Sequence, residues 1–171
     1  TDAYIKGLRE LCDRHGILLL IDEVQTGMGR TGTWFGYEHY GIEPDIFTCA
    51  KALGGGVPLG AVLAKGAVAD AFEPGNHAST FGGNPLACAA GLAVMEALDE
   101  EGLVENSQTT GQYLLEQVQV LGARYGFVTD VRGRGLMVGM QLEPTVSGAD
   151  IVNTMFDKGY LINCAGYNTL R

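Results

Sequence analysis

Hydrophobic residues recur at helical spacing in three parts of the chain. In the opening segment they form one stripe and charged residues form the other, which predicts an amphipathic helix ended by Gly16. Residues 84–100 are rich in alanine and nearly apolar on every side, so we expect a long helix buried between layers or domains. Gly102 breaks this helix, and the pattern predicts another helix from about residue 103 to residue 125.

Short apolar runs between the helices predict strands. Residues 17–21 are only Ile and Leu, which is typical of a strand buried on both faces. Two further strands are expected at residues 46–49 and 60–64, with a glycine-rich turn at residues 27–36 after the first strand. Strands separated by loops and short helices indicate an α/β layer fold, in which functional groups gather at strand ends.

The composition changes in the second half of the chain. Residues 127–131 and 136–142 alternate in polarity around a short Arg-Gly turn and predict a hairpin, and a helix at about residues 149–158 leads to a final strand. We therefore predict two domains, with residues 1–101 in a large α/β domain that includes the long apolar helix and residues 102–171 in a smaller α+β domain.

Charge and hydropathy exclude two classes of partner. The chain has 171 residues, 46% of them hydrophobic, and a net charge of −9, which argues against a nucleic-acid backbone and favours small molecules. No apolar run approaches the roughly 20 residues that span a bilayer, so we expect no membrane partner. The first helix has no preceding Met and the last strand ends without a closing element, so we interpret the chain as an internal fragment of a longer protein.

Cysteines and histidines show neither disulfide nor metal patterns. No two cysteines form a C-x-x-C pair, which favours free thiols in a reducing compartment such as the cytoplasm. The three histidines lack metal-ligand spacing with one another and with the cysteines, so no structural metal is expected. The residues concerned are Cys12, Cys49, Cys88, Cys164, His15, His39 and His77.

Asp22, which follows the first apolar run, admits several interpretations. An aspartate at a strand end is often a helix cap or a metal ligand. Together with Glu23 it also resembles the magnesium-binding strand of P-loop ATPases, although the phosphate loop that such enzymes need is absent from this chain. Downstream residues must decide between these alternatives.

Gly27, Gly29 and Gly32 match the G-x-G-x-x-G pattern of dinucleotide-binding folds. That pattern requires a strand directly before the glycines, a helix directly after them, and an acidic residue ending the next strand. Here several residues separate the strand from the glycines, an aromatic loop follows, and Asp45 precedes its strand. The glycines are better explained as turns.

Lys51 follows the second strand and precedes three glycines, residues 54–56. No other charge occurs between Asp45 and Lys65, so we expect apolar surroundings that disfavour the ammonium form and allow the amine to form a Schiff base. A carboxylate and a lysine that each follow a buried strand are what a pyridoxal phosphate enzyme uses to hold its cofactor, whereas the simple alternative is a loop that only turns the chain.

A third group of polar residues lies just before the long apolar helix. Ser79 and Thr80 supply hydroxyls, and the start of the helix supplies free N–H groups, which together suit a cofactor phosphate. Asn84 followed by Pro85 also fits a simple N-cap, and both interpretations hold together.

Five stretches, in order along the chain, resemble the class III aminotransferases of pyridoxal phosphate fold type I. The resemblance spans nearly the whole chain and implies the C-terminal part of the large cofactor-binding domain followed by most of the small domain. The stretches are Ile21–Gly32, Pro44-Asp45, Ala50–Gly56, Pro58–Gly60 and Ser79–Pro85.

The resemblance implies a role for several single residues. Lys51 would form the internal Schiff base with pyridoxal phosphate and then move protons, Asp22 would pair with the pyridine nitrogen, and Gln25 would bind the phenolic oxygen. Thr80, beside Ser79, would reach the phosphate of the neighbouring subunit, so that a homodimer shares its active sites.

The resemblance also implies the reaction. Arg171 would clamp the substrate α-carboxylate while an amino donor passes its amino group to a 2-oxo acid. In the family pattern the rest of the phosphate-binding cup lies upstream of Thr1. The P-loop ATPase interpretation is the alternative from another class, and a non-catalytic dimerisation fragment is a third possibility.

Overall fold

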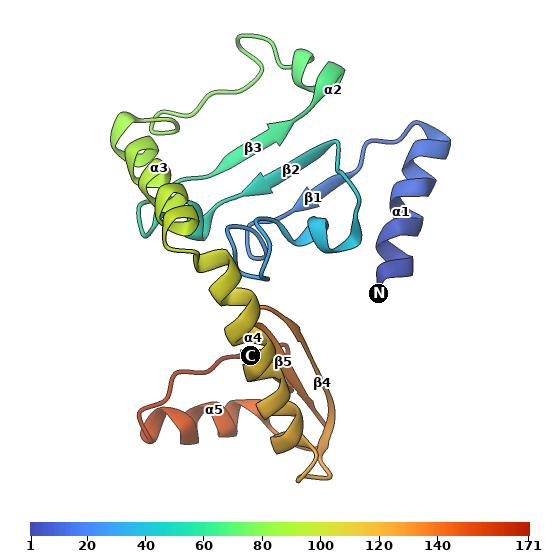
Figure 1. Cartoon of the computed structure of the whole chain (residues 1–171), viewed down its shortest axis with the longest axis vertical. Coiled ribbons are helices and arrows are strands. Elements are labelled where there is room, and N and C mark those ends of the chain that lie inside the picture. The colour runs from blue at the N-terminus through green and yellow to red at the C-terminus, as the bar shows by residue number, and fades with distance from the viewer. The chain divides into compact units, whose positions relative to one another are not determined.

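The computed structural model describes all 171 residues, and internal contacts divide it into two units, Thr1–Glu105 and Asn106–Arg171. A three-stranded sheet organises the first unit. β1 (Leu20–Asp22) pairs in parallel with β2 (Ile46–Cys49), and β2 pairs antiparallel with β3 (Ala61–Ala64) (Figure 1). Because β1 and β2 are parallel, their carboxyl ends lie at the same edge of the sheet.

The helices of this unit confirm the predicted pattern. The opening helix ends at Gly16, which adopts a left-handed conformation with φ +64° and donates its N–H to the last turn of the helix. The long apolar helix has Asn84 as its N-cap and Pro85 as its first residue. The helical elements are α1 (Asp2–His15), the 3₁₀ turns η1 (Gly36–Tyr40) and η2 (Lys51–Gly54), α2 (Gly66–Asp70) and α3 (Pro85–Glu100).

Arg9 and Asp45 fasten α1 to the amino end of the sheet. The Arg9 guanidinium contacts Asp45 Oδ2 at 2.8 Å and Asp13 Oδ1 at 2.6 Å. Asp45 also accepts the Leu19 N–H at 2.8 Å, which ties the segment before β1 to the segment before β2. The Leu19 N–H and then the Arg9 guanidinium hold the pKa of Asp45 below its ordinary value.

The core of this unit is small and includes Cys49, the last residue of β2. Three buried residues, Met28, Cys49 and Leu53, form its centre, and burial raises the pKa of the Cys49 thiol. Side chains from the loops, β3 and α3 pack around them. The surrounding residues are Trp34, Phe35, Leu59, Ala61, Val94 and Leu98.

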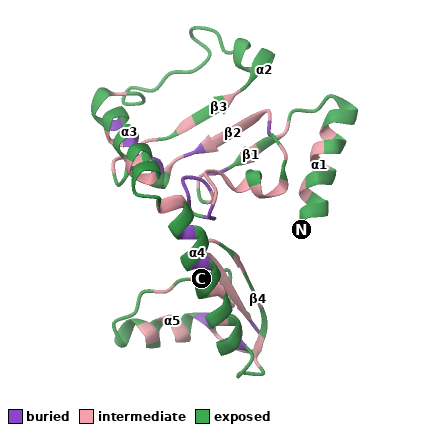
Figure 2. Cartoon of the chain, viewed as in Figure 1, coloured by how far each residue is buried: buried purple, intermediate pink, exposed green.

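Two expectations about burial are wrong. The predicted first strand begins only at Leu20, which is 54% exposed, and β2 is the only strand paired with β1. α3 buries only Ala87 and Gly91 and is otherwise half-buried or exposed (Figure 2). Leu86 at its start is 75% exposed. An apolar sequence shows that a surface can be buried, but burial requires a packing partner, and this chain places none over these side chains.

The second unit contains an antiparallel sheet in the order β4-β5-β7-β6. The predicted hairpin is present, but β4 continues through the Arg-Gly segment, so the turn is confined to Gly135 and Leu136. In place of one final strand there are two short strands that pair with each other. The strands are β4 (Val128–Arg134), β5 (Met137–Leu142), β6 (Cys164–Ala165) and β7 (Thr169–Leu170).

Helix α4 (Leu103–Gly122), which begins at the end of the first unit, packs on the β4–β5 hairpin through a close backbone approach, and α5 (Gly148–Asp157) follows β5. A Cβ atom on Gly111 would lie 2.1 Å from the Gly135 carbonyl, so this crossing requires glycine. Ser147 caps α5 by accepting the Asp150 N–H at 3.3 Å.

None of the helices combines the length and apolarity needed to cross a membrane. All four cysteines are free thiols. No group of three or more His, Cys, Asp or Glu side chains is arranged to hold a metal ion.

Candidate active site

Asp22 ends β1 with an accessible but oriented carboxylate. Its Oδ1 atom accepts the Val24 N–H at 2.9 Å and the Thr48 hydroxyl at 3.5 Å, while the residue as a whole is exposed. Thr48 is its direct partner in the parallel register of β1 and β2. The carboxylate is therefore fixed at the carboxyl edge of the sheet, as the sequence predicted, with further lone pairs available for a ligand.

Lys51 lies at the same edge, two residues beyond the end of β2. Its backbone is left-handed, with φ +48°, a conformation that costs an L-residue free energy and that concentrates at functional sites. The expectation of apolar surroundings is wrong, because Lys51 is exposed. Its neighbours in sequence are apolar, but the surroundings of an amine depend on what packs over it in space, and this chain leaves it uncovered.

Helix α3 supports the segment that carries Lys51. A Cβ atom on Gly91 would lie 3.3 Å from the Leu53 carbonyl oxygen, and one on Gly55 would lie 2.8 Å from Val94. The 3₁₀ turn η2 therefore packs directly against α3, with Leu53 in the core. This packing fixes the backbone on which the lysine stands.

Sequence reasoning missed the role of Glu23. The residue is only 2% exposed, and its carboxylate accepts hydrogen bonds from the backbone N–H groups of Gly36 at 2.9 Å and Tyr37 at 2.8 Å and from the Thr26 hydroxyl. It is therefore not available to a magnesium ion. No pattern in the sequence indicated this role, because two of the three donors are backbone groups 13 and 14 residues away.

The glycines at positions 27, 29 and 32 make turns, as predicted. No α-helix follows them, and the next element is the short 3₁₀ turn η1. Gly29 packs closely against Val104 and Leu98, with positive φ, so its place in the turn serves packing. Gln25 lies in the first part of this loop and is exposed.

Ser79 and Thr80 lie in an exposed segment just before α3. The Ser79 hydroxyl accepts the Gly82 N–H at 2.9 Å, which closes a local turn. Asn84 caps the helix by accepting the Ala87 N–H at 2.9 Å and donating to the Phe81 carbonyl at 2.8 Å. The cap is confirmed, and the phosphate-binding role of the segment stays a prediction.

Arg171 belongs to the second unit, beyond β7. Its backbone N–H donates to the Asn163 carbonyl at 2.7 Å, and the Asn163 N–H donates back to the Arg171 carbonyl at 2.9 Å. The two hydrogen bonds extend the β6–β7 ladder and fix the backbone of Arg171, whose contact with a substrate stays a prediction.

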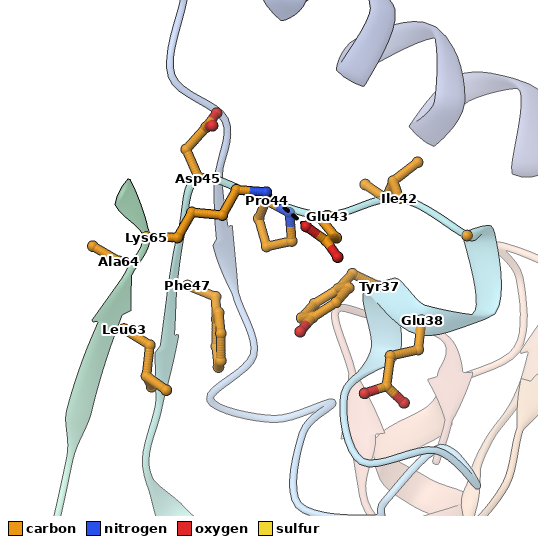
Figure 3. Close-up of a pocket in the computed structure, with 11 residues that line it drawn as sticks. Tyr37, Glu38, Ile42, Glu43, Pro44, Asp45, Phe47, Leu63, Ala64 and Lys65 are labelled. Atoms are coloured by element: carbon orange, nitrogen blue, oxygen red, sulfur yellow. Dashed lines mark hydrogen bonds and ion pairs between the residues drawn. The ribbon is translucent and has the colours of Figure 1, made fainter. Parts of the chain in front are cut away.

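A cavity of the first unit lies away from these residues. A cavity of about 570 Å³ opens at the amino end of β2, between η1 and β3 (Figure 3). Tyr37 and Phe47 line it, and an ion pair of 2.8 Å between Lys65 and Glu43 crosses its rim. Because Asp22 and Lys51 lie at the opposite, carboxyl edge, none of the site residues predicted from the sequence contributes to this cavity.

Comparison with known families agrees with this fold. The family model described as aminotransferase class-III matches residues 1–171. The chain therefore belongs to the class III aminotransferases. This result confirms the resemblance and the predicted fold class, and it excludes both the P-loop ATPase and the dinucleotide-binding interpretations.

The similar proteins include acetylornithine and ornithine aminotransferases. The chain is 52% identical over 170 residues to the acetylornithine aminotransferase of Methanocaldococcus jannaschii, covering 98% of this chain and 42% of that protein. Among solved structures, the acetylornithine aminotransferase of Elizabethkingia anophelis superposes with a TM-score of 0.91 at 34% identity, over 100% of this chain and 46% of the other. The ornithine δ-aminotransferase of Plasmodium falciparum gives 0.93 at 36% identity, over 100% and 44%. The chain thus spans less than half the length of these relatives.

Proposed function

We propose that the intact protein is a pyridoxal phosphate-dependent aminotransferase in which Lys51 holds the cofactor and Asp22 binds its ring. The supporting observation is that Asp22, with its oriented carboxylate, and Lys51, with its left-handed backbone, lie at the same carboxyl edge of the parallel pair β1 and β2. A primary amine and a carboxylate fit the two ends of pyridoxal phosphate, an aldehyde and a basic ring nitrogen.

Different residues of this chain would bind the cofactor ring and transfer protons. When bound, pyridoxal phosphate supplies an electron sink for the α-carbon of the substrate. The Asp22 carboxylate would keep the ring nitrogen protonated, since a nearby negative charge favours the positively charged form. The Lys51 amine would attach the cofactor and then, once released, carry a proton to and from the substrate α-carbon. Gln25, in the loop after Asp22, would donate to the phenolic oxygen.

Other parts of the chain would bind charged groups. Ser79 and Thr80 would bind the cofactor phosphate in a partner subunit, which makes the proposed enzyme a homodimer with shared sites. The exposed position of this segment and the helix start behind it support that assignment. Arg171 would bind the substrate α-carboxylate with its planar guanidinium.

For the substrate, we propose N-acetylornithine with 2-oxoglutarate, giving N-acetylglutamate semialdehyde and glutamate in cytoplasmic arginine biosynthesis. Curated acetylornithine aminotransferases at about 50% identity support this choice. The alternative is another ω-aminotransferase that acts on ornithine, succinylornithine or 4-aminobutyrate, and the similarity to solved ornithine aminotransferases favours keeping ornithine in the test. Residues 1–101 and 102–171 would then belong to the large and small domains.

Replacing the lysine tests the central claim. The intact protein, incubated with pyridoxal phosphate and reduced with borohydride, should carry the cofactor on the peptide that contains Lys51, and Lys51→Ala should abolish this mass label and the visible absorption band. Lys65→Ala is the matched control, because Lys65 is exposed and lies at the opposite edge of the sheet. An undiminished label in the Lys51→Ala protein would refute the proposal.

The amino donor is tested separately. Initial rates with N-acetylornithine, ornithine, succinylornithine and 4-aminobutyrate, each with 2-oxoglutarate, should give the highest kcat/KM for N-acetylornithine. A higher value for any other donor would replace the substrate assignment and leave the assignment of Lys51 intact.

A further inference from the structure

Glu23 is a buried charge that organises the loop after β1. Its carboxylate Oε2 atom accepts the Gly36 N–H at 2.9 Å and the Thr26 hydroxyl, while Oε1 accepts the Tyr37 N–H at 2.8 Å. A carboxylate that is only 2% exposed is retained only if donors replace its water, and three donors do so here. All three belong to the loop or to η1 directly after it.

The backbone of Glu23 is equally constrained. Its N–H donates to the Thr48 carbonyl at 2.9 Å, which continues the pairing of β1 with β2, and its carbonyl accepts the Gly27 N–H at 2.9 Å. The backbone N–H of Glu23 is therefore hydrogen-bonded to the sheet. Its backbone carbonyl and its carboxylate are hydrogen-bonded to the loop and to η1. Any rearrangement of the loop has to break these bonds together.

The two groups proposed to bind the cofactor ring adjoin this anchor. Asp22 precedes Glu23 directly, and Gln25 lies inside the turn that the Gly27 bond closes. The space around the carboxylate is tight, since a Cβ atom on Gly36 would lie 3.3 Å from Glu23 Oε2. The position of the carboxylate thus determines the path of the chain through both residues.

We propose that Glu23 is a positioning residue, whose buried carboxylate holds Asp22 and Gln25 at the spacing that the cofactor ring requires. This inference rests on the proposed function, because it assumes that the ring binds at Asp22. Glu23 itself does not contact the cofactor. It acts through the loop, by fixing the turn from residue 23 to residue 27 against η1.

Glu23→Gln is the informative change because it preserves shape and removes the charge. An amide offers one acceptor oxygen and one NH₂ group, so either orientation sets an N–H against at least one of the backbone donors Gly36 and Tyr37. The loop must then move to relieve the contact, and Asp22 and Gln25 move with it. In metal sites, loss of a hydrogen-bond partner behind a ligating side chain typically weakens metal affinity by about 10- to 100-fold, and we expect an effect at the lower end of that range here.

Asp45→Asn is the matched control. Asp45 is also a largely covered carboxylate that accepts a backbone N–H, that of Leu19, and it joins the same two strands at their amino ends. Its replacement should lower stability without altering the site. A simply structural role for Glu23 predicts that the two variants lose stability alike and retain the same affinity for pyridoxal phosphate.

The experiment is a titration of the intact, cofactor-free protein with pyridoxal phosphate labelled with ¹⁵N in the ring. We expect the Kd to rise about tenfold in Glu23→Gln and to stay unchanged in Asp45→Asn. We also expect the ¹⁵N resonance of the bound ring to show reduced protonation only in Glu23→Gln, and faster amide exchange in residues 24–37. Equal Kd values and equal ¹⁵N shifts in the wild-type protein and Glu23→Gln would overturn the proposal.

A second variant decides the case if Glu23→Gln does not fold. Thr26→Val removes one donor to the carboxylate and leaves the charge in place, so a smaller change in the same direction is expected, and an unchanged Kd would overturn the proposal. The proposed function fails differently, since the wild-type protein would then take up no pyridoxal phosphate on Lys51.

Discussion

Asp22 lies directly opposite Thr48 in the parallel register of β1 and β2, and the Thr48 hydroxyl donates to the Asp22 carboxylate over 3.5 Å. The pairing places Asp22 at the edge where β2 also ends, two residues before Lys51. A slip of one residue in this register would turn the Asp22 side chain to the other face of the sheet. The register therefore sets the geometry of the proposed cofactor site.

The Thr48 hydroxyl should contribute only modestly to this site. We expect Thr48→Val to weaken pyridoxal phosphate binding by less than about tenfold, because the net contribution of one hydrogen bond is about 1 kcal/mol and the Val24 N–H at 2.9 Å remains. Thr48→Ser retains the hydroxyl and should bind like the wild-type protein. A loss as large as that of Asp22→Ala, measured by titration, would contradict this expectation.

The left-handed backbone at Lys51 should carry a measurable cost. In the cofactor-free protein we expect Lys51→Gly to be more stable than Lys51→Ala by about 1 kcal/mol, because glycine adopts positive φ without the penalty paid by a residue with a Cβ atom. Urea unfolding of the two variants measures the difference. If Lys51→Ala is as stable as Lys51→Gly, the lysine is not held in a strained conformation.

The stability of the first unit should depend on pH through Asp45. The pKa of this carboxyl is lowered in the folded protein by the Leu19 N–H and then by Arg9, so the unfolded chain binds the proton first as the pH falls. The stabilisation is complete above the pKa of the unfolded chain, about 4, and is lost as the pH falls through the lower folded value.

Urea unfolding of the wild-type protein and Asp45→Asn over a series of pH values checks this. The difference in unfolding free energy should be largest near neutral pH and should shrink below about pH 4. A difference that stays constant down to about pH 3 would show that the ionised form of Asp45 contributes nothing.

The two helical glycines Gly111 and Gly7 should respond in opposite directions to alanine. A Cβ atom on Gly111 would lie 2.1 Å from the Gly135 backbone, so we expect Gly111→Ala to lower the unfolding free energy by about 1–3 kcal/mol despite the helix preference of alanine. Gly7 in α1 has no atom within 4 Å of such a Cβ, so Gly7→Ala should raise stability by about 0.5–1 kcal/mol. Thermal unfolding of both variants tests the two expectations. A stabilising Gly111→Ala would show that α4 does not pack closely against the backbone of Gly135.

Sequence patterns predicted the helices and strands better than they predicted which side chains are buried. Gly16, Asn84 and Pro85 mark helix ends by local backbone chemistry, so the bounds of α1 and the start of α3 could be predicted closely. Burial of α3 and the apolar environment of Lys51 were predicted wrongly, since both depend on which distant segments pack over them.

The sequence by itself determined the family, the elements and the candidate residues Asp22 and Lys51, because motifs and hydrophobic periodicity are local properties of the chain. Only the tertiary structure decided that these two residues share one sheet edge, that Lys51 has a left-handed backbone, and that Glu23 is a buried anchor. The physical reason is that strand register, backbone conformation and the partners of a buried charge depend on groups far apart in sequence, such as Glu23 and the N–H of Tyr37.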